Sequence, residues 1–199
     1  MKKVLFAAAA FGVLSFTSCD STTNNTADGT NTTISDETDA VDRAEDINEE
    51  NLPGRAEDMA DFMIEAANSN MAEIELGKLA AQKATDPEVK KFGQMMASDH
   101  GKASEEMKTL AASKNVTLPT GLSDDMQKKQ TDLSKLTGAE FDKEYINLMV
   151  DMHEKDVSKF KEASEDLDDA ETKAFAAKTL PTLQAHLDQV KKIDDRLDK

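Results

Sequence analysis

The chain has one cysteine and no tryptophan among its 199 residues. It therefore lacks the disulfide bonds that often stabilise small exported proteins. A single cysteine cannot form an internal disulfide, so the fold must be held by its apolar core. No Cys-x-x-Cys-His motif is present, which excludes covalently attached haem. Basic residues are also scarce: 24 Lys and Arg stand against 40 Asp and Glu, for a net charge of −16. Such a chain repels phosphate, which excludes nucleic acid as a partner.

The longest apolar run lies at the N-terminus. Lys2 and Lys3 precede the run from Val4 to Phe16, and small residues lead on to Cys19. The run is shorter than the roughly 20 residues of a membrane span but fits the apolar part of a cleaved signal. This segment resembles a bacterial lipoprotein signal peptide. The resemblance predicts a signal peptide at 1–18 and a lipidated Cys19, whose acyl chains hold the protein to a membrane of the cell envelope. The outer membrane, the periplasmic face and the cell surface all stay open as locations.

Residues 19–56 have the composition of a linker. Ser, Thr, Asn, Asp and Gly dominate up to Thr33, and an acid-rich stretch follows to Glu50. The apolar residues are too scattered to bury a face, which predicts a disordered acidic tether. A weak helical pattern over Asp39–Glu50 leaves a short helix there as an alternative.

Residues 57–199 have helical periodicity, with apolar residues every three or four positions. The pattern predicts one long helix that ends near Lys83, a second near Lys114, a short helix over Asp124–Leu136, and two further long helices that begin near Thr137 and after Asp169. The expected fold is an all-α four-helix bundle, with the short extra helix in the connection between helices two and three. That connection spans roughly 23 residues, so helices two and three can run parallel.

Local signals mark the helix ends. Two segments, Thr85-Asp86-Pro87-Glu88 and Thr137-Gly138-Ala139-Glu140, match capping boxes in which the threonine caps the helix. Pro181 falls inside the last helix, where we expect a kink or a carbonyl without its partner.

Four polar residues interrupt the apolar stripes, one on each long helix. They are Glu73, His100, His153 and His186, and the last three are all the histidines of the chain. Counted from the two expected hairpins, near residues 85 and 168, they lie 12, 15, 15 and 18 positions away. At 1.5 Å per residue, the two members of each pair differ in height by only about 5 Å. The spacing therefore predicts that all four lie in one layer at mid-bundle.

Three interpretations of this layer stay open. It can be a structural polar layer, a small-ligand pocket, or a site for a transition metal ion with Glu73, His100, His153 and His186 as ligands and Asp99 as a further ligand or an outer acceptor. Met96 and Met149 each precede a histidine by four residues, a pairing of thioether and imidazole that suits copper. Methionine in a helical core more often fills gaps.

Several segments resemble one known bacterial family, domain of unknown function 4142. They are Glu73-Ile74-Glu75-Leu76-Gly77-Lys78-Leu79-Ala80, Asp86-Pro87-Glu88-Val89-Lys90, Met96-Ala97-Ser98-Asp99-His100, and Thr179-Leu180-Pro181-Thr182-Leu183-Gln184-Ala185-His186-Leu187. The resemblance covers about residues 57–195. It implies a ferritin-like fold and an exported or envelope-attached protein, and it implies no activity.

The sequence gives no sign of an enzyme. A ferritin-like di-iron site needs Glu-x-x-His on two helices, but Ala97, Val150 and Leu183 stand three positions before the histidines. No strand-turn-helix element exposes a nucleophilic serine. The sequence thus favours a membrane-tethered envelope lipoprotein with a non-enzymatic structural, stress-related or partner-binding role. The alternative is a metal-binding bundle, with redox chemistry as one option.

Overall fold

The computed structural model describes residues 39–52 and 54–199, which contain helices and no strand. The predicted signal peptide and Cys19 lie outside these residues. The helices are α1 (Ala40–Asn51), α2 (Arg55–Lys83), α3 (Pro87–Lys114), α4 (Asp124–Lys135), α5 (Gly138–Asp166) and α6 (Ala170–Leu197). Within the described ranges, none of them is both long and apolar enough to cross a membrane.

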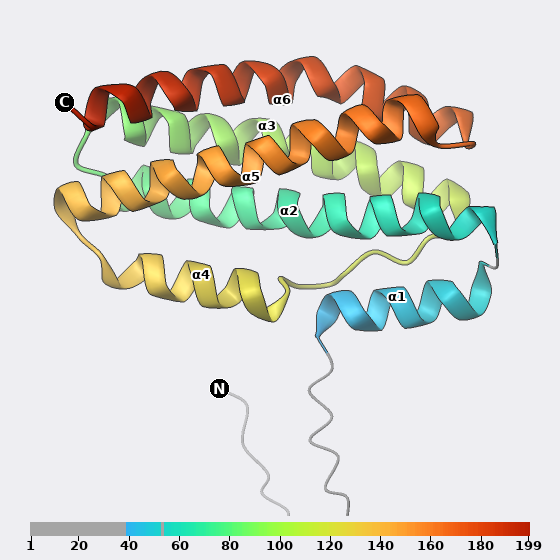
Figure 1. Cartoon of the computed structure of the whole chain (residues 1–199). Helices are drawn as coiled ribbons and strands as arrows, with labels where there is room; N and C mark the ends of the chain where they lie inside the picture. Colours follow the sequence, from blue (N-terminus) through green and yellow to red (C-terminus); the bar gives the residue numbers. More distant parts are fainter. Residues whose placement is uncertain (1–38, 53) are drawn as a thin grey trace, which may run out of the picture. The chain divides into compact units, whose positions relative to one another are not determined.

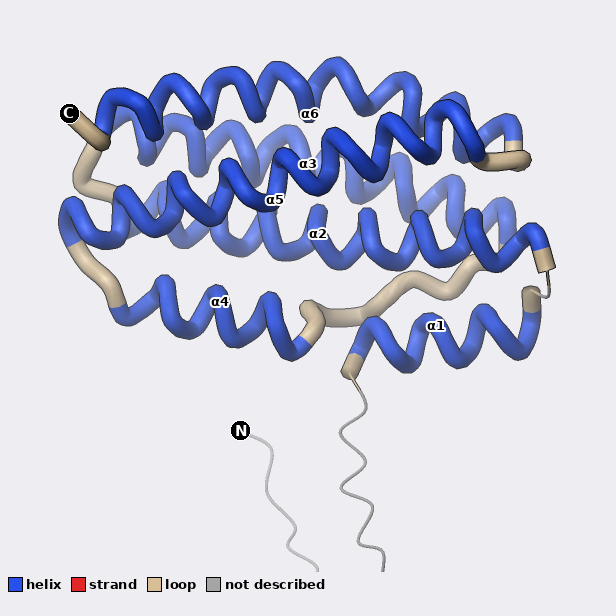
Figure 2. Tube along the Cα trace, in the orientation of Figure 1, coloured by secondary structure: helices blue, strands red, loops and turns tan. Residues whose placement is uncertain are grey.

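The four long helices, α2, α3, α5 and α6, lie side by side as two hairpins (Figure 1). Packing is densest within the pairs α2–α3 and α5–α6. The connection after α3 returns along the length of the molecule through α4, so that α3 and α5 run in the same direction (Figures 1 and 2). The predicted short helix in this connection is present as α4, and the parallel arrangement that the length of the connection permits is the one observed.

The buried core consists of two apolar clusters. The first contains Phe92, Tyr145 and Val190, and the second contains Phe160 and Phe175. Buried polar residues lie at or next to the place where each long helix passes from one apolar cluster to the other. They include Glu73, His100, His153 and His186, one from each of the four helices. The polar layer therefore crosses the middle of the molecule.

Two glycines allow α2 and α3 to approach closely at one point. A Cβ atom added at Gly77 would lie 2.7 Å from the carbonyl oxygen of Gly93, and one at Gly93 would lie 2.8 Å from the carbonyl oxygen of Gly77. Neither position leaves room for a side chain, because the neighbouring atoms belong to the backbone. Glu73 lies one turn before Gly77 on α2, and His100 lies two turns after Gly93 on α3. The contact therefore fixes the distance between these two residues.

Helix α1 corrects the prediction of a disordered tether for residues 40–51. Ala44 and Asn48 are buried. The Asn48 Nδ2 donates to the Thr117 carbonyl at 2.8 Å, and the Thr117 amide donates to Asn48 Oδ1 at 2.8 Å. Asp39 caps the helix by accepting from the Val41 amide. A buried asparagine paired with a distant loop stabilises a helix whose own apolar content is low.

The caps differ from the predicted capping boxes. Asp86, and not Thr85, caps α3 by accepting from the amides of Glu88 and Val89. The Thr85 side chain and amide instead donate to the buried carboxylate of Asp142 on α5. Thr137 precedes α5 without a side-chain hydrogen bond to the helix. In the last helix, α6 continues through Pro181 as one element.

Candidate metal centre

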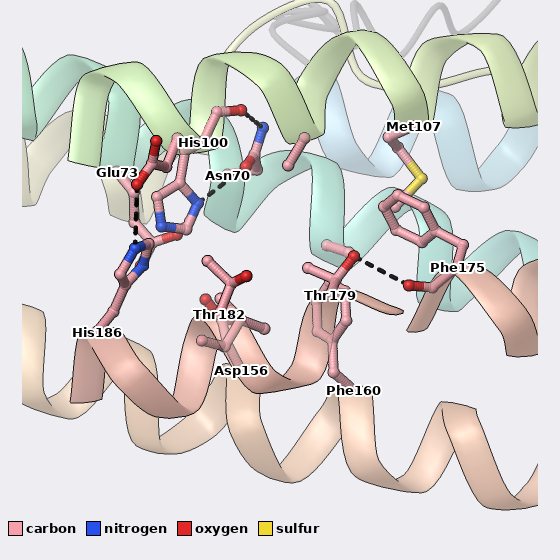
Figure 3. Close-up of a pocket in the computed structure, with 14 residues that line it drawn as sticks. Asn70, Glu73, His100, Met107, Asp156, Phe160, Phe175, Thr179, Thr182 and His186 are labelled. Atoms are coloured by element: carbon pink, nitrogen blue, oxygen red, sulfur yellow. Dashed lines mark hydrogen bonds and ion pairs between the residues drawn. The ribbon is translucent and has the colours of Figure 1, made fainter. Parts of the chain in front are cut away.

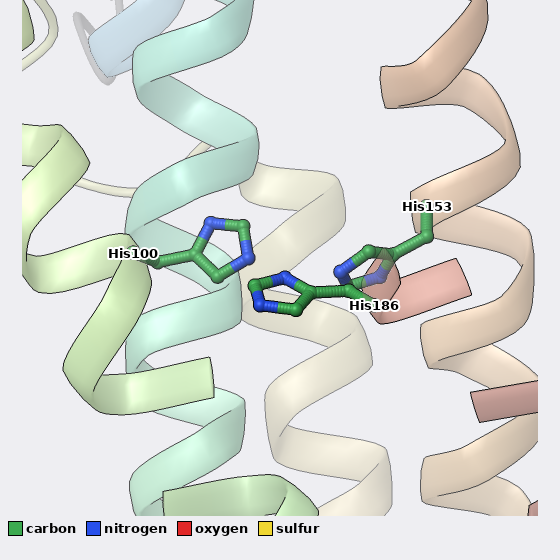
Figure 4. A group of neighbouring side chains, drawn as sticks. All are labelled: His100, His153 and His186. Carbon is green, nitrogen blue, oxygen red and sulfur yellow. The ribbon is translucent and has the colours of Figure 1, made fainter. Parts of the chain in front are cut away.

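The three histidines come together in the middle of the protein. Their side chains project from α3, α5 and α6 into one space (Figure 4). The ring centroids are 5.4 to 5.6 Å apart in all three pairs. One nitrogen from each ring lies within 4.8 Å of the others. We call His100, His153 and His186 the histidine cluster; each is at most 4% exposed.

One nitrogen of each ring faces an acceptor outside the cluster. The Nδ1 of His100 lies 2.9 Å from Asn70 Oδ1, and Asn70 in turn donates to the His100 carbonyl. The Nδ1 of His153 lies 2.9 Å from the Met149 carbonyl. The Nε2 of His186 lies 3.5 Å from an oxygen of Asp99. The oxygens of Asn70 and Met149 accept hydrogen bonds, so Nδ1 of His100 and of His153 carries the ring proton, and the nearby Asp99 carboxylate favours the proton on Nε2 of His186.

The opposite nitrogen of each ring has no partner. His100 Nε2, His153 Nε2 and His186 Nδ1 are buried and make no hydrogen bond within the described residues. In the tautomers set by the outer acceptors, each of these nitrogens carries a free lone pair. A buried polar atom without a partner costs about 1–3 kcal/mol. Three rings with one such nitrogen each, whose centroids lie within 5.6 Å of one another, match the donor set of a metal ion held by imidazoles.

Glu73 bridges two of the rings from the outer side. Its carboxylate oxygens lie 2.9 Å from His100 Nδ1 and 3.2 Å from His153 Nδ1. These contacts are close but not aligned as hydrogen bonds, so both oxygens lack a well-formed partner within the described residues. Burial raises the pKa of Glu73 to about 7, and the attraction of His153 acts in the opposite direction. The carboxyl group can therefore hold or release a proton near neutral pH.

Burial keeps the histidines neutral. It lowers the pKa of His100 to about 4 and that of His186 to about 4, although nearby Asp99 acts in the opposite direction on both. Burial also lowers the pKa of His153, against the attraction of Glu73. Neutral imidazole is the form that binds metals. At neutral pH a metal ion can therefore bind these rings without first displacing a proton from them.

The structure brings Glu73, His100, His153 and His186 together, as the spacing predicts, and places Asp99 at the edge. The Asp99 side chain is 32% exposed and forms an ion pair with Lys102 at 2.9 Å. The hydrogen bond from Lys102 lowers the pKa of Asp99. Asp99 thus has the position of an outer acceptor for His186, which is the second of its two predicted roles.

Sequence reasoning missed two further polar residues of the layer. Asn70 is partly buried and orients His100. Asp156 is 5% exposed, with one oxygen 2.8 Å from the Ser69 hydroxyl. Burial raises the pKa of Asp156 to about 7. Asn70 stands three positions before Glu73 and Asp156 three after His153, a spacing that places each pair on one helix face. This spacing is the signal that could have identified them.

A small pocket adjoins the cluster. Its volume is about 40 Å³. Figure 3 shows that polar side chains, including those of Asn70, His100 and His186, gather at one end, while Phe175 and Met107 lie at the other. His153 does not line this pocket.

Comparisons with known proteins support the fold and the family. The family described as "Domain of unknown function (DUF4142)" matches residues 45–193. A crystal structure of a protein from Streptomyces coelicolor described as secreted, DUF305, has 15% sequence identity and a TM-score of 0.56. The match covers 70% of this chain and 94% of that one, and at this identity it shows a shared fold alone. The comparison with curated proteins finds no match.

Proposed function

This chain belongs to the family described as domain of unknown function DUF4142, and from that premise we propose that its helical domain binds one transition metal ion through His100, His153 and His186. Asn70 orients the His100 ring and the Met149 carbonyl orients the His153 ring. The Glu73 carboxylate lies against both rings. Asp99 is the outer acceptor for His186.

One observation carries the proposal. Each ring uses one nitrogen on an outer acceptor and leaves the other buried without a partner within the described residues. A structural layer needs pairwise hydrogen bonds among its members, whereas this arrangement leaves three lone pairs unused. Histidines that ligate metals regularly donate their second nitrogen to a carboxylate or a carbonyl.

The donor set favours a particular class of ion. Imidazole nitrogen suits zinc, copper, iron and nickel, and three imidazoles leave a fourth position open. Metal–nitrogen bonds of about 2.0–2.1 Å require ligand nitrogens about 3–4 Å apart. The separations of up to 4.8 Å therefore need side-chain movements of about 1 Å. Met96 and Met149 belong to the first apolar cluster, so the proposal uses nitrogen donors only.

Metal titration tests this proposal. The chain from Asp20 onward, purified without a histidine tag, should bind one zinc ion per molecule by isothermal titration calorimetry. At a free zinc concentration about 100 times the Kd, the free energy of unfolding should rise by about 2.7 kcal/mol. His153→Ala should abolish both effects.

Glu154→Ala is the matched control for binding to the acidic surface. Glu154 follows His153 on α5, is exposed, and forms an ion pair with Lys191. This variant should bind zinc as the parent does. If the parent binds no zinc, or if His153→Ala still binds one ion, the layer is structural and the metal proposal fails.

We further propose that Cys19 is lipidated and anchors the domain to a membrane of the cell envelope, and that the four long helices form a four-helix bundle of ferritin-like layout. The support for anchoring is the sequence from Lys2 to Cys19. Cys19→Ala should move the protein from the membrane fraction to the soluble fraction or block its processing. Normal processing with continued membrane association would contradict the anchor.

A further inference from the structure

Metal binding by the histidine cluster does not by itself require the pocket beside it. Two of the proposed metal ligands, His100 and His186, also form its wall, and the third, His153, does not. A metal held by the three rings has an open fourth position. Because two ligands border the pocket, we infer that this position faces the pocket.

We propose that the pocket binds a small neutral ligand of two or three heavy atoms, of the class of dioxygen and nitric oxide, at the open position of the metal. This inference rests on the proposed metal site. It adds a ligand class, a binding space and a route of entry.

The size of the pocket limits the ligand. One water needs about 10–15 Å³ of cavity volume, and an engineered cavity of about 150 Å³ holds benzene. The pocket measures about 40 Å³, so it accommodates two or three heavy atoms and excludes sugars, nucleotides and amino acids.

The charges of the wall favour a neutral ligand. Glu73, Asp99 and Asp156 all line the pocket. An anion that enters loses its hydration and faces three carboxyl groups. At the far end, Met107, Phe160 and Phe175 provide apolar contacts, which suit a ligand with no net charge.

The ligand has a route between α3 and α6. Asp99 and Ala103 on α3 and Thr179 on α6 are partly exposed, and Thr182 is exposed. All four line the pocket. Their side chains are short, so the space between these two helices is closed by small groups rather than by large apolar ones.

Nitric oxide added to the Fe(II)-loaded chain tests the proposal. The protein from Asp20 onward is first loaded with Fe(II) without oxygen, and the metal content is measured. Nitric oxide bound to high-spin Fe(II) gives a characteristic electron paramagnetic resonance signal, which reports occupancy. We expect saturable binding, and affinity for azide, an anion of similar size, at least about tenfold weaker.

Pocket-filling variants separate the pocket from the metal. Ala103→Leu adds three carbon atoms at the pocket wall and should weaken nitric oxide binding by about tenfold or more while Fe(II) affinity stays within about twofold. Ala112→Leu, an exposed position on the same helix, should change neither. If Ala103→Leu does not fold, Ala66→Val provides the same test from α2.

The outcomes distinguish the two proposals. If the parent does not bind Fe(II), the ligand proposal is overturned, and zinc binding in the titration above decides whether the metal proposal survives. If Fe(II) binds but nitric oxide does not, if azide binds equally well, or if Ala103→Leu binds nitric oxide as the parent does, the pocket proposal is overturned and the metal site stands.

Discussion

The close contact of α2 and α3 allows the same substitution to have opposite effects at two positions of one helix. Alanine in place of a helical glycine normally stabilises by about 0.5–1 kcal/mol. At Gly101 the new methyl group would meet no atom within 4 Å, so Gly101→Ala should gain this amount. At Gly93 it would lie 2.8 Å from the Gly77 carbonyl oxygen and 2.8 Å from the Cβ of Ala80. Backbone atoms cannot move aside as a flexible side chain can.

The magnitude follows from these contacts. Overpacking a core costs about 1–3 kcal/mol, and the helical gain offsets part of this. Gly93→Ala should therefore destabilise the protein by up to about 2.5 kcal/mol. For a folded region of this size, 1 kcal/mol corresponds to a change in Tm of about 2–4 °C. Gly93→Ala should thus lower the Tm by several degrees, and Gly101→Ala should raise it by about 1–4 °C.

Thermal unfolding followed by circular dichroism at 222 nm measures both changes, with denaturant titration as an independent check. Zinc affinity provides a second readout. Gly93→Ala should weaken it because wider spacing of α2 and α3 moves Glu73 away from His100, whereas Gly101→Ala should leave it unchanged. Equal Tm shifts of the same sign in the two variants would refute the argument that these helices meet through their backbones.

Two further predictions concern pH and α1. Without metal, the free energy of unfolding should change little between about pH 7 and pH 5, because opposing groups titrate. Burial lowers the pKa of two cluster histidines from 6.5 to about 4, so the unfolded chain takes up protons first and stability falls as the pH falls. Burial raises the pKa of Glu73 and Asp156 to about 7, so the folded chain holds protons that the unfolded chain releases, and stability rises as the pH falls. Asp156→Asn removes one of the two carboxyl groups with a raised pKa. Urea titrations of this variant should show a free energy of unfolding that falls between pH 7 and pH 5. A flat profile would contradict the raised pKa of Asp156. Asn48→Ala should weaken the docking of α1 by about 1–3 kcal/mol and speed hydrogen exchange in residues 40–51 alone. Asn51→Ala is the control and should not change the exchange, because the Asn51 side chain forms its hydrogen bond within α1. Equal exchange in both variants would show that Asn48 does not hold α1.

The long helices and the polar layer follow from sequence spacing because both depend on regular geometry. A rise of 1.5 Å per residue sets the height of each residue along its helix. The stripe of apolar residues shows which face of the helix is buried. Counting residues from two hairpins therefore places His100 and His186 at similar heights. The spacing does not reveal ring orientation, since that depends on Asn70 and the Met149 carbonyl, which are fixed only when the helices pack.

Helix α1 and the caps depend on contacts between distant segments, which local patterns do not contain. Asn48 looks like a linker residue, but its partner Thr117 is 69 positions away. Thr85 fits a capping box, but the buried Asp142 on another helix competes for its hydroxyl and amide. In both cases a tertiary hydrogen bond overrides the local preference.

The division of the long helices into two hairpins has a consequence for cooperativity. The hairpin α2–α3 contributes His100, while α5–α6 contributes His153 and His186, and packing within each hairpin is denser than packing between them. If each hairpin opens as a separate foldon without metal, each has its own free energy of opening. An ion shared by both would have to be released before either could open alone. Metal binding would thus convert two units of local unfolding into one, and native-state hydrogen exchange would show the two groups of amide rates merge.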